Sequence, residues 1–99
     1  MIVHIKVFSL INSVDISINT DANTFLCNGK VVSIDTISFV TKLQHITGSW
    51  SEYLVDSSIR DGASFYVCYK GKSFTKIYSG VNRFPLNYAE FEKLIGGVM

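Results

Sequence analysis

The sequence predicts an α+β fold: an antiparallel sheet built from hairpins, with two helices packed on one face. Two observations lead to this class. Apolar and polar residues alternate over most of the chain, as in half-buried strands, and two stretches repeat instead with a helical period. The resulting order of strands, helix, strands, helix needs no long crossover between parallel strands. The chain has 99 residues, so we expect residues 1–99 to form a single domain.

The first strands are expected at residues 2–10 and 14–18, where every second residue is apolar. Asn12-Ser13 lies between them and favours a turn, so the two strands predict an N-terminal hairpin. Asn28-Gly29 is the strongest short hairpin signal in the chain, because both residue types tolerate a positive φ. It predicts a further hairpin between the strand-like runs on either side of it.

The first helix is predicted within residues 33–47. Apolar side chains there, Ile37 among them, fall on adjoining rows of a helical surface. Asp35 or Ser33 can cap the start by accepting from a free backbone N–H group. Gly48 stands where a left-handed residue commonly ends a helix. We therefore expect this helix to end at Gly48.

The second half of the chain predicts another hairpin and a closing helix. Residues 50–55 fit either a short strand or a continuation of the first helix, whereas residues 64–69 and 74–79 alternate as two strands of a hairpin. Pro85 ends the following loop, and Asn87-x-x-Glu90 resembles a capping box with Asn87 as the cap. The apolar face of the closing helix consists of Tyr88, Phe91, Leu94 and Ile95, and Gly96-Gly97 ends it.

Composition narrows the classes of function. Nine basic and eight acidic side chains give a net charge of +1, which argues against a dedicated nucleic-acid binder with its usual basic excess. Charged residues make up only 17% of the chain, so we expect a partner to cover part of the apolar surface. Neither a membrane span nor a secretion signal is recognisable, which predicts a cytoplasmic protein with no membrane partner. The oligomeric state, including a homodimer, stays open.

We expect no catalytic residues, no metal site and no cofactor. His4 and His45 are the two histidines, and neither stands in a motif with a nucleophile or a pair of carboxylates. Glycine-rich phosphate loops are missing from the sequence. Cys27 and Cys68 lack the spacing of metal ligands and lie in apolar runs, so we expect two buried thiols in a reducing compartment, with a disulfide as the alternative.

An acidic segment with aromatic residues is the first candidate for partner binding. It contains Trp50, Glu52, Tyr53, Asp56 and Asp61. Aromatic anchors beside carboxylates suit a protein partner with a basic patch, and Trp50 is the expected anchor. The alternative interpretation places Trp50 and Tyr53 in the core and leaves the acids as solubilising groups.

A basic hairpin is the second candidate. Lys70, Lys72 and Lys76 lie within residues 70–83, which contain no acid, and Phe74 and Tyr78 interleave with them. Cations beside aromatic rings can bind RNA, so a small RNA-binding regulatory protein is the alternative function. Lysines also protect the edges of sheets against association, and the low net charge favours that interpretation.

The C-terminal third resembles a known group of proteins. Its residues read Gly80-x-Asn82-x-Phe84-Pro85-x-Asn87-Tyr88-x-Glu90-Phe91-x-x-Leu94-Ile95. This pattern is similar to the tail of small bacterial immunity proteins encoded beside polymorphic toxins, including those of contact-dependent growth inhibition. The resemblance implies a non-catalytic antitoxin that binds a cognate toxin domain, a nuclease in many such systems, and blocks its active site or docking surface. The motif itself has structural explanations: Gly80 allows a positive φ, Phe84 enters the core and Asn87 caps the helix.

Overall fold

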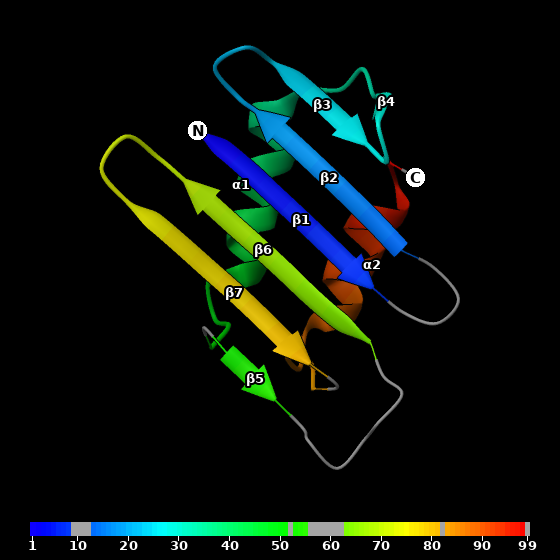
Figure 1. Cartoon of the computed structure of the whole chain (residues 1–99), viewed down its shortest axis with the longest axis vertical. Helices are drawn as coiled ribbons and strands as arrows, with labels where there is room; N and C mark the ends of the chain where they lie inside the picture. Colours follow the sequence, from blue (N-terminus) through cyan, green and yellow to red (C-terminus); the bar gives the residue numbers. More distant parts are fainter. Residues whose placement is uncertain (9–12, 52, 56–62, 82, 99) are drawn as a thin grey trace.

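The computed structural model describes residues 1–8, 13–51, 53–55, 63–81 and 83–98, and it confirms the α+β fold class. Within these ranges the chain forms seven strands and two helices, seen in Figure 1. Their bounds are β1 Ile2–Phe8, β2 Ser13–Asn19, β3 Thr24–Cys27, β4 Lys30–Val31, α1 Thr36–Thr47, β5 Tyr53–Val55, β6 Ser64–Lys70, β7 Thr75–Val81 and α2 Tyr88–Gly96.

The strands lie in one sheet in the order β4-β3-β2-β1-β6-β7-β5. All neighbouring pairs from β4 to β7 are antiparallel, as the hairpin signals predict. The N-terminal strand β1 is in the middle, between β2 and β6 (Figure 1). At the far edge β5 pairs in parallel with β7, a pairing that the sequence did not indicate. Residues 53–55 are thus a strand and not an extension of the first helix.

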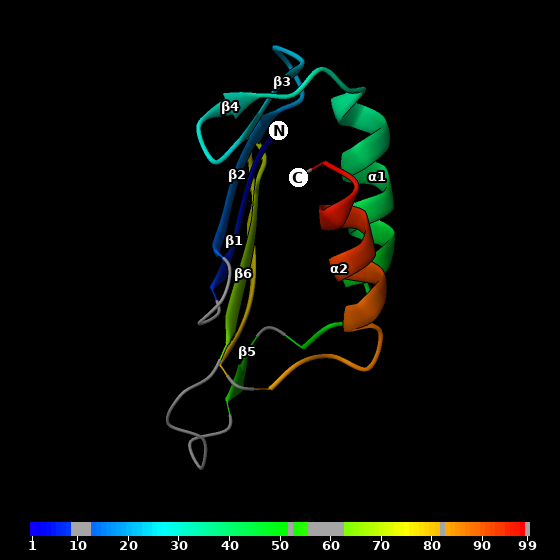
Figure 2. The same cartoon turned by 90° about the vertical axis from the view of Figure 1, so that its right-hand side faces the viewer.

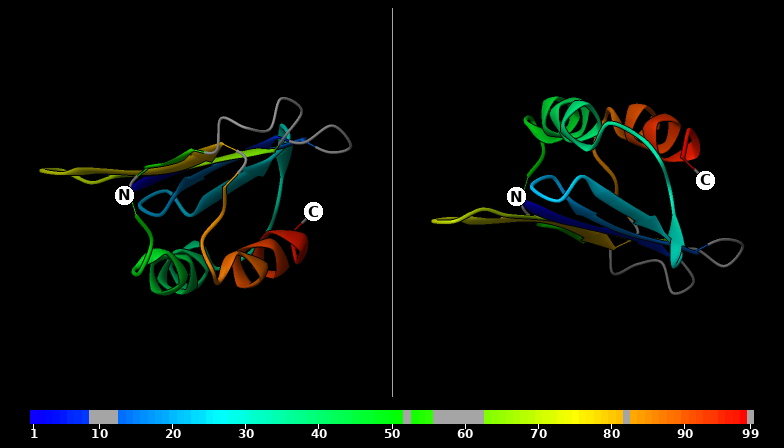
Figure 3. Two further views of the ribbon diagram at one scale, coloured as in Figure 1. Left: turned by 90° about the horizontal axis from the view of Figure 1, so that it is seen from below. Right: turned by 90° about the horizontal axis from the view of Figure 1, so that it is seen from above.

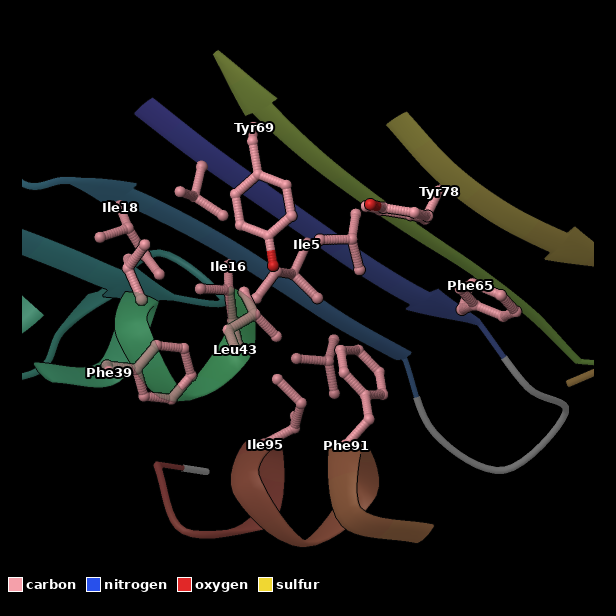
Figure 4. Close-up of a cluster of buried hydrophobic side chains, with 14 of the residues drawn as sticks. Ile5, Ile16, Ile18, Phe39, Leu43, Phe65, Tyr69, Tyr78, Phe91 and Ile95 are labelled. Carbon is pink, nitrogen blue, oxygen red and sulfur yellow. The ribbon is translucent and has the colours of Figure 1, made fainter. Parts of the chain in front are cut away.

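Both helices cover the same face of the sheet, so the molecule has two layers (Figures 2 and 3). The core lies between the layers, where alternate residues of β1, β2, β3, β6 and β7 meet one side of each helix. Figure 4 shows these side chains pointing toward one another from both layers. The sheet contributes Ile5, Ile16, Ile18, Phe65, Tyr69 and Tyr78, α1 contributes Phe39 and Leu43, and α2 contributes Phe91 and Ile95.

Two local signals in the sequence are confirmed. Asn28 and Gly29 have φ values of 52° and 80°, which are the positive values that a tight hairpin turn between β3 and β4 requires. Asp35 caps α1, because its Oδ1 accepts a hydrogen bond of 3.2 Å from the backbone N–H of Ser38. Ile37, however, does not join the core, since 63% of it is exposed.

Three predictions for glycine and asparagine are wrong. Gly48 has a right-handed conformation with φ −60°, so α1 does not end in a left-handed cap. Gly80 does not have a positive φ. It is needed for space instead, because an added Cβ would stand 2.3 Å from Cε1 of Phe65 and the ring of Phe65 could not lie over this position. Asn87 makes no side-chain cap hydrogen bond.

The side chain of Asn87 joins the two helices instead. Its Oδ1 accepts a hydrogen bond of 2.6 Å from Nε1 of Trp50, and its Nδ2 donates one of 2.9 Å to the carbonyl oxygen of Ile46. Ile46 lies in the last turn of α1, where carbonyl groups lack partners within the helix. Asn87, at the start of α2, therefore supplies a hydrogen-bond donor to a carbonyl group at the end of α1.

The two cysteines lie on opposite sides of the sheet. Cys27 is buried on the helix side, as expected, whereas Cys68 is half-buried on the other side, and both thiols are free. The prediction of two buried thiols is therefore wrong for Cys68. In the parts of the chain that the structure describes, no helix is long and apolar enough to cross a membrane.

Candidate partner-binding site

The structure places Trp50 in the core and not at the surface. Only 7% of it is exposed, and its ring lies edge-on to Phe65 and Phe91 at centroid distances of 5.2 and 5.3 Å. Its indole N–H is satisfied by Asn87. A side chain enclosed in this way is not available as an exposed anchor, which corrects that part of the prediction. The alternative interpretation, Trp50 as a core residue, describes its position.

The structure describes only part of the rest of the acidic segment. Tyr53 lies in β5, where it pairs with Ser79 of β7. Glu52, Asp56 and Asp61 lie outside the described residues. The structure therefore leaves the role of these three carboxylates as a prediction.

The basic hairpin does not present its residues on one face. Lys70 lies on the side of the sheet away from the helices, whereas Phe74, Lys76 and Tyr78 lie on the helix side, beside Tyr69. Tyr78 is buried, with 8% of it exposed. Lys72 lies in the turn, at the end of the hairpin that projects past the helices (Figure 3). These residues form no common surface for a nucleic-acid strand.

The arrangement of the layers leaves one face of the sheet as a different candidate for partner binding. The face of the sheet opposite the helices is not covered by either helix, as the edge-on view in Figure 2 shows. We call it the open face. Its residues are the outward members of β1–β4, β6 and β7: Ile2, His4, Lys6, Phe8, Ser13, Asp15, Ser17, Asn19, Thr24, Leu26, Val31, Ser64, Tyr66, Cys68, Lys70, Thr75, Ile77, Ser79 and Val81.

Register aligns these residues in rows across the strands. One row runs Ile77, Cys68, His4, Ser17, Leu26 and Val31. The adjacent row runs Ser79, Tyr66, Lys6 and Asp15. Direct cross-strand neighbours have their Cβ atoms about 5 Å apart. Lys6 is therefore flanked by an aromatic ring on one side and a carboxylate on the other.

A shallow depression of about 600 Å³ lies at the centre of the open face. It is lined by His4, Lys6, Phe8, Ser64, Tyr66 and Cys68, which come from the paired strands β1 and β6. A hydrogen bond with the Cys68 side chain raises the pKa of Tyr66 above its usual value of 10.0. Among the described residues no group of three metal-ligating side chains occurs.

The open face combines apolar and polar groups in the way that protein interfaces do. Phe8 is 57% exposed and Val31 81% exposed, and Ile77 and Val81 are also exposed. Aromatic and aliphatic side chains at the centre of an interface, with polar groups around them, are typical of contacts between proteins. This arrangement can bind another molecule through apolar contacts, hydrogen bonds from Tyr66 and charges of both signs.

The comparisons with known proteins come to one result. The chain matches no family model, no curated protein and no solved structure. The resemblance to immunity proteins therefore rests on the sequence pattern alone.

The sequence signals for the open face were present but incomplete. Alternation placed His4 and Lys6 on the outward face of one strand, and it placed Tyr66 and Cys68 together on one face of another without indicating that this face is outward. The sequence did not indicate that these two strands are neighbours in the sheet. Four strands and a helix separate β1 from β6 along the chain. The depression could not be deduced without that pairing.

Proposed function

We propose that this chain is a cytoplasmic, non-catalytic immunity protein of a bacterial toxin system. It binds a cognate toxin domain and blocks its active site or its docking surface. The open face supports the binding role, and the tail pattern supports the assignment to immunity proteins. Both supports are independent of the acidic segment, whose Trp50 belongs to the core.

The open face suits a protein partner because it is built on a rigid scaffold. β1 is hydrogen-bonded on both sides, to β2 and β6, so the backbone that carries the central rows is held in a fixed position. Binding then requires little ordering of the backbone, which lowers the entropic cost of association. Exposed apolar groups at Phe8 and Ile77 supply area that gains free energy when a partner covers it.

Charge on this face favours a protein over a nucleic acid. Lys6 and Asp15 are direct neighbours, and Lys70 lies in a different row, so cations are interspersed with an acid. Phosphate backbones attract concentrated positive charge. The alternative function, RNA binding by residues 70–83, gains no support from the geometry, because Lys70 and Phe74 point to opposite sides of the sheet.

Retrieval of the partner is the first experiment. The tagged chain is expressed in the organism that encodes it, and complexes are washed with high salt. We expect a stoichiometric protein, identified as a toxin domain at the end of a larger exported protein. RNA that washes off as salt rises would instead favour the alternative function. A chain recovered without any partner would contradict the proposal.

Variants then connect binding to the open face. Phe8→Ser and Lys6→Glu remove an exposed ring and reverse a charge there, and we expect each to weaken toxin binding about tenfold or more. Ile37→Ser is the matched control, because Ile37 is exposed on α1 in the other layer. Binding is measured by calorimetry, and protection by the growth of cells that express the toxin. Full protection by both open-face variants would refute the role of this face.

A further inference from the structure

A leucine projects from the loop that leads into α2. Leu86 is fully exposed, unlike most large apolar residues of the described chain. It belongs to the stretch Arg83, Phe84, Pro85 and Leu86, which we call the loop corner. This stretch crosses from the sheet layer to the helix layer at the end of the molecule where β7 ends (Figure 2).

The backbone around Leu86 is held on both sides. Before it, the ring of Phe84 packs on Tyr88 at a centroid distance of 4.5 Å, and Pro85 restricts its own φ. After it, Asn87 is bonded to the end of α1 and to Trp50. The N–H of Tyr88 donates to the carbonyl of Pro85 at 3.1 Å, closing a turn around Leu86. The leucine is thus presented by a fixed loop.

Such presentation is the arrangement of a binding anchor. A leucine on a flexible loop loses backbone entropy when it binds, whereas one on a fixed loop has already lost that part. The core beneath is filled by Phe65, Phe84 and Tyr88, whose rings contact one another, so Leu86 is kept outside. The side chain has apolar area that no described part of the chain covers.

Two neighbouring features indicate the chemistry of that molecule. A depression of about 510 Å³ adjoins Leu86, lined by the loop corner together with Ser49, Trp50, Ser51 and Asn87. Arg83 is exposed at its edge and brings positive charge and planar N–H donors. An apolar projection beside a cationic, partly polar depression is complementary to an apolar pocket with a carboxylate at its rim.

We infer that the loop corner is a second contact with the partner protein. Leu86 inserts into an apolar pocket of the partner, and Arg83 binds an acidic side chain beside that pocket. This inference rests on the proposed function, because it names a contact with the same toxin domain. Val81 of the open face is exposed and immediately precedes this end of the molecule, so one partner can cover both surfaces.

The test measures affinity for the retrieved toxin domain by calorimetry. We expect Leu86→Glu to weaken binding at least about thirtyfold, the loss typical of an interface hot spot. Arg83→Glu should also weaken binding, more at low salt than at high salt, because screening reduces the contribution of the charge. Ile37→Glu is the matched control and should bind as the unmodified chain does, since it places the same charge on an exposed apolar position elsewhere.

Each outcome decides a different point. Urea unfolding of Leu86→Glu shows whether this variant retains the fold. Leu86→Ser is measured beside it as a second variant that introduces no charge. Binding of both leucine variants within twofold of the unmodified chain would overturn the loop-corner contact and leave the proposed function standing. Retrieval of no partner, or of copies of this chain alone, would overturn the proposed function and this contact together.

Discussion

Replacing Asn87 by serine distinguishes two structural roles of this residue. If Asn87 acted as the N-cap of α2, serine would replace it with little loss, since both are good caps. The structure instead has its amide bonded to Nε1 of Trp50 at 2.6 Å and to the carbonyl of Ile46 at 2.9 Å. Serine is too short to make both bonds, so we expect a large destabilisation.

The magnitude follows from the two bonds. Each hydrogen bond contributes a net ~1 kcal/mol, and an indole N–H left unpaired inside the protein costs about a further 1 kcal/mol. Trp50 is only 7% exposed, so water replaces the lost partner poorly. The sum is about 2–3 kcal/mol in the free energy of unfolding. For a domain of this size that lowers Tm by about 10–20 °C.

Urea unfolding is the assay, followed by the fluorescence of Trp50, which is the single tryptophan. The matched control is Asn19→Ser. The side chain of Asn19 only accepts from the backbone N–H groups of the next turn, at 3.0 and 3.2 Å, and serine can do the same. A free energy of unfolding for Asn87→Ser within about 0.5 kcal/mol of the unmodified chain, at equal m-value, would refute the reasoning.

Three further substitutions test other parts of the fold. Gly80→Ala forces the ring of Phe65 to move, because the new Cβ would lie 2.3 Å from its Cε1. Urea unfolding should show that the free energy of unfolding falls by about 2 kcal/mol. The control is Gly96→Ala, which should show no loss of stability because nothing lies within 4 Å of its added Cβ. Asp35→Ala removes the cap of α1 and should lower stability by about 1 kcal/mol in thermal melts followed by circular dichroism. Burial raises the pKa of Tyr69 from 10.0 to about 12, so the fold favours the neutral phenol. Its contribution to stability is complete below pH 10 and is lost as pH rises to about 12; Tyr69→Phe should reduce this fall in urea midpoints measured against pH, and an unchanged profile would contradict it.

The sequence predicts the two faces of each strand because burial of one side imposes a period of two on the chain. Ile5 and Val67 are core residues, as their alternation indicates, and His4 on the other side of β1 is exposed. Local signals were also sufficient where the local backbone decides the outcome. The positive φ values of Asn28 and Gly29 are one example.

Features that depend on distant contacts could not be predicted. Asn87 has the sequence position of a cap, but its partners belong to the end of α1, and no local pattern indicates them. Gly80 stands opposite Phe65 only because β6 and β7 pair in this register. The same limit applies to the site. Both helices were expected on one face, yet the rows of the open face depend on the position of β1 between β2 and β6.

The central position of β1 has a consequence for synthesis of the chain. Its pairing with β2 is local and can form early, but its other edge pairs with β6, which joins Ile2 to Lys70. Contacts between such distant segments are slow to form. Until β6 leaves the ribosome, the half-built sheet has a bare row of N–H and carbonyl groups along an apolar strand, and such edges pair readily with other chains. Chaperones that shield extended strands should therefore increase the yield of folded protein, most clearly when synthesis is fast.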